Sequence, residues 1–88
     1  MEIIGLKTFK AVVEEGGIRG ASDKLHTVQS NITSRIQKLE EELDAKLFRM
    51  SGRKLELTPT GQLLYKYAVE IIQLEYQAAS AIRFSKGS

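Results

Sequence analysis

Apolar residues recur at intervals of three and four positions over the first part of the chain. Between Ile3 and Glu15 they alternate with charged side chains, a pattern typical of a helix that buries one face. Gly16 and Gly17 follow directly, and glycine readily adopts the left-handed conformation found where helices end. We therefore expect a first helix over residues 3–15 and a second, short helix over residues 18–25.

The next segment repeats the helical periodicity but has a polar outer surface. Thr27 can cap a helix that begins there, and the apolar spacing continues to residue 43. The residues expected on its buried face are Val28, Ile32, Ile36, Leu39 and Leu43. The side chains on the outer face of its N-terminal half can all form hydrogen bonds, and they are Gln29, Ser30, Asn31, Thr33, Ser34, Arg35 and Lys38. Acidic residues occur only at its far end, at positions 40–42.

Helical periodicity then stops, and two short apolar stretches flank a turn. Residues 46–49 and 55–58 predict two strands, and the turn between them contains Ser51, Gly52, Arg53 and Lys54. A hairpin with a basic tip is the simplest interpretation. Thr58 followed by Pro59 is a typical helix start, and we expect a long helix from residue 59 to about residue 84.

Two apolar rows run along this last helix. One has the spacing of a coiled-coil seam and comprises Tyr67, Ile71, Leu74, Ala78 and Ala81. The other comprises Leu64, Ala68, Ile72, Ala79 and Ile82. Two rows suggest two partners, the parent domain and a second copy of the chain; the alternative is that one monomer buries both. A helix of about twenty-five residues is about 40 Å long, more than a small three-helix body covers, and this favours a dimer. The expected interface residues are Leu64, Tyr67, Ala68, Ile71, Ile72, Leu74, Ala78, Ala79 and Ile82.

Composition narrows the function classes. The 88 residues include no Cys and one histidine, His26, and the formal net charge of the chain is only +2. Without Cys there is no disulfide, thiol nucleophile or cysteine zinc site, and a single histidine leaves little material for catalysis or metal binding. Glu2 and Lys7 interrupt any signal-like apolar run, so we expect no signal peptide and no membrane span. We therefore expect a cytoplasmic, non-enzymatic domain without a metal or cofactor.

The order of the elements points to nucleic acid. Two short helices joined tightly around His26 match a helix-turn-helix, in which the second helix places its N-terminal turns in a DNA major groove. Gln29 and Asn31 suit adenine edges, and arginine suits guanine. Arg53 on the hairpin tip suits a narrow minor groove. The predicted fold is mainly α: a winged helix-turn-helix, with a three-helix body and a two-stranded wing, followed by a long dimerisation helix.

Several motifs occur together in this chain. They are Phe9-x-x-Val12-x-Glu14-Glu15-Gly16-Gly17-Ile18, Ala21-Ser22-x-x-Leu25, Gln29-Ser30-Asn31-Ile32-Thr33-Ser34-Arg35-Ile36-x-x-Leu39-Glu40-x-x-Leu43, Leu47-Phe48 and Leu57-Thr58-Pro59-Thr60-Gly61. In this combination, residues 6–61 resemble the N-terminal DNA-binding domain of LysR-type transcriptional regulators. The resemblance covers about two thirds of the chain.

The resemblance implies a bacterial transcription factor that binds double-stranded promoter DNA as a homodimer, and it leaves open whether the full-length protein forms a tetramer. It implies a DNA-binding domain over residues 1–58 and a dimerisation helix over residues 59–88. Family members carry a C-terminal effector domain, which we do not expect within these 88 residues, and a small-molecule inducer is expected only in that domain. Arg19 stands where the family usually has threonine and adds a candidate phosphate contact, and Asp44 stands where glycine is usual.

The expected DNA-contacting residues are Arg19, Gln29, Ser30, Asn31, Thr33, Ser34, Arg35, Lys38, Arg53 and Lys54. The near-neutral charge motivates an alternative, a dimeric helical module that binds proteins and shows no specific DNA binding. A sequence-blind architectural DNA binder is disfavoured because such proteins carry a larger basic excess.

Overall fold

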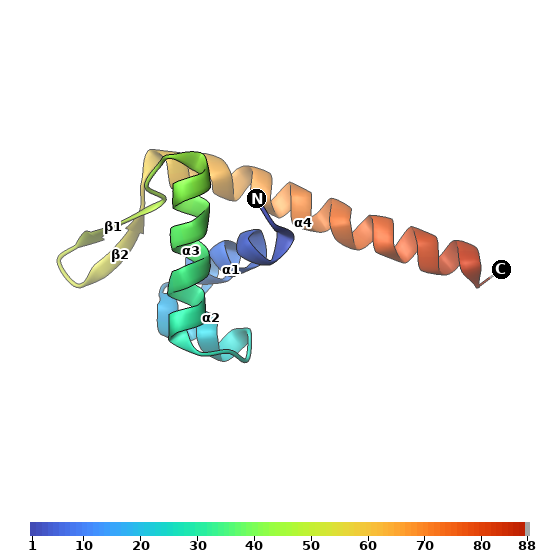
Figure 1. The fold of residues 1–88 in the computed structure, drawn as a ribbon, viewed down its shortest axis with the longest axis horizontal. Coiled ribbons are helices and arrows are strands. Elements are labelled where there is room, and N and C mark those ends of the chain that lie inside the picture. Colours follow the sequence, from blue (N-terminus) through green and yellow to red (C-terminus); the bar gives the residue numbers. More distant parts are fainter. Residues whose placement is uncertain (88) are drawn as a thin grey trace.

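Four helices and one β-hairpin make up the fold. A computed structural model of the chain describes residues 1–87. The elements are α1 (Ile3–Glu15), α2 (Ile18–Lys24), α3 (Gln29–Leu43), β1 (Phe48–Ser51), β2 (Lys54–Leu57) and α4 (Pro59–Lys86). As Figure 1 shows, the first three helices form a compact body, the hairpin projects from one side of it, and α4 extends far beyond the other side. The predicted winged helix-turn-helix with a long C-terminal helix is confirmed.

Helix α1 is the centre of the body, and α2, α3 and α4 all pack against it. Leu6, Phe9 and Val12 on its inner face are fully or almost fully buried. Ala21 of α2 has no exposed surface, and its small side chain allows α1 and α2 to approach closely. The other buried core residues are Ala11, Ile32, Ile36, Leu39, Leu47, Leu64 and Ala68.

The start of α3 differs from the prediction. The N-cap residue is Val28, in an extended conformation and without a side-chain capping bond, so the expected cap by Thr27 is wrong. The Thr27 hydroxyl instead accepts a hydrogen bond from the side-chain amide of Asn31, at 2.8 Å. Val28 and Leu43 were expected to face inward, but they are 61% and 38% exposed. They flank α3 at its two ends, where the body no longer covers the helix.

The hairpin also begins later than the sequence pattern predicts. The strands pair antiparallel, with Phe48 opposite Leu57 and Ser51 opposite Lys54, so the turn consists of Gly52 and Arg53 alone. Gly52 has φ 64°, a left-handed conformation that glycine adopts without strain. Leu47, which was expected in the first strand, lies wholly buried in the core.

The beginning of α4 is fixed by a capped turn packed against the chain before the wing. The Thr58 hydroxyl accepts a hydrogen bond from the backbone N–H of Gly61 at 3.0 Å, as a helix cap should, and Pro59 occupies the first turn. The Thr58 hydroxyl also donates to the carbonyl oxygen of Lys46. The wing and α4 therefore share one anchor.

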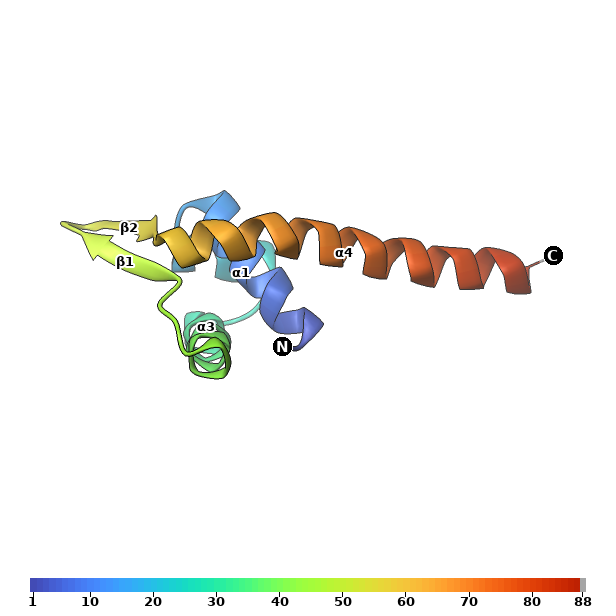
Figure 2. The same cartoon turned by 90° about the horizontal axis from the view of Figure 1, so that it is seen from above.

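The two apolar rows of α4 have different environments. Leu64 is only 9% exposed and Ala68 is not exposed at all, because α1 and the rest of the body cover them. Their assignment to a dimer interface is therefore wrong: they belong to the monomer core, and Ile71 and Ile72 pack partly against the same core. The large apolar side chains of α4 that remain exposed include Tyr67 and Leu74 of the other row, at 51% and 63%, and Ile82 at 63%, which shares the row of Leu64 but lies beyond the body. Figure 2 shows α4 passing over α1 and continuing alone.

No helix within residues 1–87 is long and apolar enough to cross a membrane.

Candidate nucleic-acid interface

The N-terminal half of α3 presents a polar surface to solvent. Gln29, Ser30, Asn31, Thr33 and Ser34 are all exposed, and the opposite face is held against the body by Ile32, Ile36 and Leu39. The structure thus brings these five predicted contact residues together on one outward surface. Amide and hydroxyl side chains in this position can exchange hydrogen bonds with base edges or phosphates.

The first turn of α3 has its own structural features. Because Val28 supplies no capping side chain, the first backbone N–H groups of the helix have no side-chain acceptor. Such a helix start attracts anions. Asn31 is held in place, since its amide nitrogen donates to the Thr27 hydroxyl while its amide oxygen remains an acceptor. Asn31 therefore has a preset orientation.

Arg35 and Lys38 lie further along α3 and contact residues in α1 or just before it. Arg35 is half-buried, and one of its guanidinium nitrogens lies 3.4 Å from the hydroxyl of Thr8 in α1. The ammonium group of Lys38 forms an ion pair with Glu2, just before α1. This pairing raises the pKa of Lys38 and lowers the pKa of Glu2. The structure therefore gives these two predicted contacts partners within the protein.

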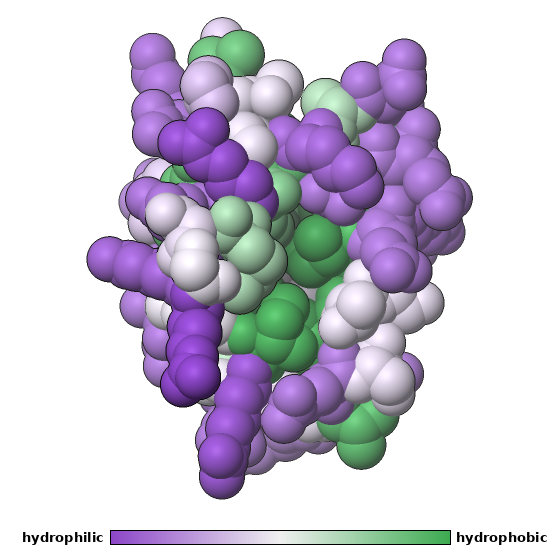
Figure 3. Space-filling view, turned by 90° about the vertical axis from the view of Figure 1, so that its left-hand side faces the viewer, coloured by the Kyte–Doolittle hydropathy of each residue, from purple (hydrophilic) through white to green (hydrophobic). Residues whose placement is uncertain are grey.

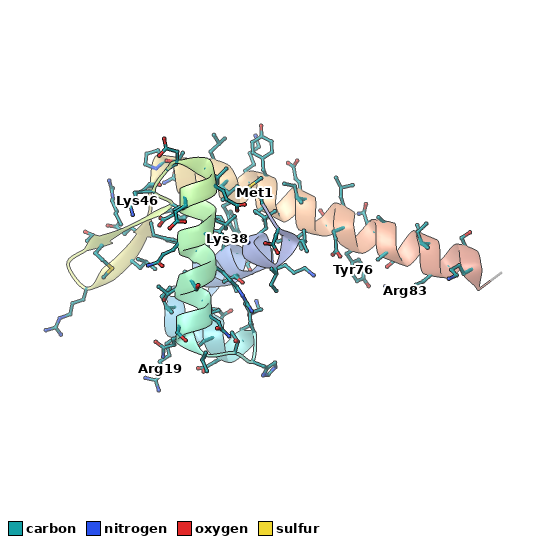
Figure 4. All side chains as sticks on the ribbon, viewed as in Figure 1. Met1, Arg19, Lys38, Lys46, Tyr76 and Arg83 are labelled. Atoms are coloured by element: carbon teal, nitrogen blue, oxygen red, sulfur yellow. The ribbon has the colours of Figure 1, made fainter. Side chains whose placement is uncertain are left out.

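Two further basic sites lie outside α3, on α2 and at the end of the wing. Arg19, in the first turn of α2, is exposed and extends from the body on the side where α3 begins (Figure 4). Arg53 and Lys54 are exposed at the end of the wing. A groove between the wing and the turn at residues 16–18 separates these sites, and Met50, Leu55 and Ile18 contribute its apolar lining. Figure 3 shows hydrophobic side chains between hydrophilic ones on this side of the molecule.

Some basic side chains form ion pairs with carboxylates and others do not. Most lysines of the body pair with carboxylates, namely Lys7, Lys10, Lys24, Lys38 and Lys46. Within residues 1–87, the structure gives no such partner to Arg19, Arg49, Arg53 or Lys54, all of which lie on α2 and the wing. The small net charge of +2 therefore includes exposed cations on α2 and the wing that have no carboxylate at ion-pair distance.

Three structural features of this region were not predicted from the sequence. Arg49 is exposed on β1 without a carboxylate partner, although its position was not among the expected contacts. Glu2 neutralises a predicted contact residue from a distant part of the sequence. Glu40 accepts a hydrogen bond from the backbone N–H of Leu47 at 2.8 Å, so it anchors the entry to the wing. Strand alternation could have indicated Arg49, whereas the other two depend on tertiary contacts.

The described part of the chain, residues 1–87, holds no cluster of three or more His, Cys, Asp or Glu side chains arranged for a metal ion.

Comparison with known proteins identifies the family. The sequence profile of the bacterial regulatory helix-turn-helix proteins of the lysR family matches residues 4–62. This chain belongs to the lysR family. It is 47% identical over 78 residues to the HTH-type transcriptional regulator YofA of Bacillus velezensis, and 42% identical over 86 residues to YofA of Bacillus subtilis. These matches cover 89% and 98% of the chain but only 27% and 30% of the two relatives. The chain thus corresponds to less than a third of these LysR-family regulators, and the resemblance inferred from the motifs is confirmed.

Solved structures of LysR-family proteins share the fold. The DNA-binding domain of BenM, in a complex with catB site 1 DNA, superposes with a TM-score of 0.95 at 35% identity, covering 100% of this chain and 99% of that one. The DNA-binding domain of CbnR, also in a complex with DNA, gives a TM-score of 0.90 at 35% identity, covering 98% and 99%. In full-length CbnR the match covers only 29% of that chain, with a TM-score of 0.90.

Proposed function

We propose that residues 1–88 bind double-stranded DNA in a sequence-specific manner as the DNA-binding part of a LysR-type transcriptional regulator. The observation that carries this proposal is the combination of exposed amides and hydroxyls on α3 with exposed cations on α2 and the wing that have no carboxylate partner. Polar side chains on a helix supply base readout, and unpaired cations supply attraction to phosphates. The DNA complexes of BenM and CbnR, which have the same fold, support it.

In this proposal each element has one task. Gln29, Ser30, Asn31, Thr33 and Ser34 enter a major groove, where Asn31 is the most constrained reader of base edges. Arg19 contacts a phosphate beside that groove. Arg53 and Lys54 reach the adjacent minor groove or its phosphates. Arg35 and Lys38 contribute less than the sequence suggests, because Thr8 and Glu2 already engage them.

We further propose that two copies associate through the outer apolar row of α4, defined here as Tyr67, Leu74, Ala78 and Ile82. All four side chains are exposed: Tyr67, Leu74 and Ala78 belong to the row that the body leaves uncovered, and Ile82 lies on the free part of α4 beyond Glu75. Ile71 and Ala79 border this row and are half-buried already. A dimer would place two α3 helices on one DNA duplex, and tetramers would require the remainder of a full-length protein.

The chain acts by binding rather than by catalysis, in the bacterial cytoplasm where promoter DNA lies. It binds DNA without a cofactor, and an inducer acts through parts of the longer regulators that correspond to none of these residues.

The decisive test is a comparison of specific and random DNA. Selection from a pool of random duplexes should enrich one interrupted palindrome, and fluorescence anisotropy should then show a dissociation constant for it at least about a thousandfold lower than for random duplex. Affinity should fall steeply as salt increases. Equal affinity for both duplexes would contradict sequence-specific binding, and an absence of binding at low salt would favour the protein-interaction alternative.

A further inference from the structure

Two polar contacts join α1 to α4. Near the C-terminal end of α1, a carboxylate oxygen of Glu14 accepts a hydrogen bond from the phenolic hydroxyl of Tyr65 at 2.9 Å. Nearer the other end of α1, the ammonium group of Lys7 lies 3.6 Å from a carboxylate oxygen of Glu75. The two contacts lie about 15 Å apart along α4 at the usual helix rise. They therefore hold two separate points of α4 against the same helix.

The apolar contact between these points is narrow. Between Tyr65 and Glu75, Ala68 is fully buried but contributes only one methyl group, and Ile71 and Ile72 pack only partly against the core. A narrow apolar stripe resists separation of the helices but resists rotation of one against the other much less. Side-chain contacts at two separated points supply that second restraint.

Glu14 also connects this contact to the DNA-reading part of the body. Its carboxylate lies 3.0 Å from the ammonium group of Lys10 and 3.6 Å from that of Lys24, the last residue of α2. Helix α2 in turn packs against α3. The hydrogen bond of Lys10 and that of Tyr65 lower the pKa of Glu14, so it stays ionised at neutral pH. One carboxylate thus joins α1, the helix that supports α3, and α4.

Beyond Glu75, α4 leaves the body and continues to Lys86 with a largely exposed surface. Figure 2 shows this free segment continuing in the direction set where α4 crosses α1. The orientation of each body relative to its own α4 then decides where its α3 lies. The molecule measures 25 Å across its second principal axis. A rotation of about 10° over that distance moves the far side by roughly 4 Å, slightly more than the roughly 3.4 Å rise of one base pair.

We infer that Tyr65, Glu14, Lys7 and Glu75 are positioning residues that determine which spacing between two half-sites the dimer accepts. This inference rests on the proposed function, because it requires two copies joined through α4 and bound to one duplex. None of the four residues needs to touch DNA. Their effect on spacing passes through the angle between α4 and the body.

The test uses the 88-residue chain and DNA selected from a pool of random duplexes about 40 base pairs long. Anisotropy titrations then compare the selected spacing with spacings changed by one and two base pairs, and with a duplex that carries a single half-site. We expect wild type to favour its selected spacing by about tenfold over a change of one base pair, within the range that a hydrogen bond to a charged group can contribute. Tyr65→Phe and Lys7→Glu should each reduce this preference to about threefold or less, with single-half-site affinity within about twofold of wild type.

Matched variants distinguish an effect on the angle between α4 and the body from a general loss of folding or DNA binding. The exchange Lys7→Glu with Glu75→Lys restores opposite charges and should restore the spacing preference. Tyr76→Phe and Glu70→Gln change exposed groups of α4 and should leave it unchanged. The inference is wrong if Tyr65→Phe and Lys7→Glu keep the wild-type spacing preference. It is also wrong if they weaken binding to the single half-site as much as binding to the duplex with the selected spacing. If wild type selects no sequence, the proposed function itself is wrong.

Discussion

Gly61 lies directly against the backbone of Leu47. A β-carbon added to Gly61 would lie 2.2 Å from the carbonyl oxygen of Leu47 and 2.8 Å from a side-chain carbon of Leu57. No side-chain rearrangement relieves the first of these contacts, because the obstructing atom belongs to the backbone. The first turn of α4 can therefore meet the entry to the wing only through a residue without a side chain.

Gly61→Ala should lower the free energy of unfolding by about 1–3 kcal/mol, the usual cost of forcing one extra carbon into a packed site. Urea denaturation followed by circular dichroism measures it. Gly17→Ala is the matched control, since a β-carbon there meets nothing within 4 Å and its backbone is extended. Equal destabilisation by both substitutions would show that the contact with Leu47 is unimportant.

The sequence predicted most of the fold because the apolar spacing is regular where helices are buried on one face. Leu6, Phe9 and Val12 of α1, and Ile32, Ile36 and Leu39 of α3, occupy the core as their periodicity indicates. Periodicity does not show where a neighbouring element ends. Val28 and Leu43 continue the pattern of α3 and remain exposed, because no part of the body reaches them.

The candidate site was predicted less completely. Residue type and position along α3 correctly indicated an exposed polar surface at residues 29–34. Long-range ion pairs are not encoded in local sequence, so the pairing of Lys38 with Glu2 was not expected. The same reason explains why Leu64 and Ala68 were placed in a dimer interface: both rows of α4 are apolar, and only the packed body shows which row it covers.

Arg53→Ala should weaken DNA binding most at sites whose outer positions are A·T-rich, because arginine is attracted to a narrow minor groove. Loss of one phosphate-neutralising charge should also make the slope of log affinity against log salt concentration shallower by about 0.9 for each protomer. Salt titrations by fluorescence anisotropy measure both effects. Lys66→Ala removes an exposed charge from α4 and should change neither. An identical loss in both variants would mean that the wing contributes only general charge.

Glu2→Gln should increase DNA affinity by about twofold to fivefold at low salt, because it frees the ammonium group of Lys38. Glu41→Gln is the control: it removes the same charge from the exposed surface of α3 without releasing a cation at ion-pair distance. If both substitutions raise affinity equally, the gain reflects net charge alone.

The pairing of Glu2 with Lys38 also predicts a pH dependence. Lys38 lowers the pKa of Glu2 below its usual value of 4.5. The folded-state pKa is therefore depressed, so the contribution of the pair to stability is present above about pH 4.5 and is lost as pH falls through the lower folded-state value. The carboxyl resonance of Glu2, followed by NMR during an acid titration, should have its midpoint below that of the same residue in a Lys38→Ala variant. Coincident midpoints would contradict the ion pair.

Leu74→Asp should convert the proposed dimer to monomer, because it places a carboxylate in the outer apolar row of α4. Leu74 suits this test better than Ile71, since Leu74 is 63% exposed whereas Ile71 packs partly against the monomer core. Sedimentation velocity should show a single species of about 9.8 kDa for the variant, with its helical circular dichroism retained. Gln77→Asp adds the same charge outside this row and should leave the dimer intact. A dimer that survives Leu74→Asp would assign the interface to another surface, and the two α3 helices would then be positioned by contacts other than those of α4.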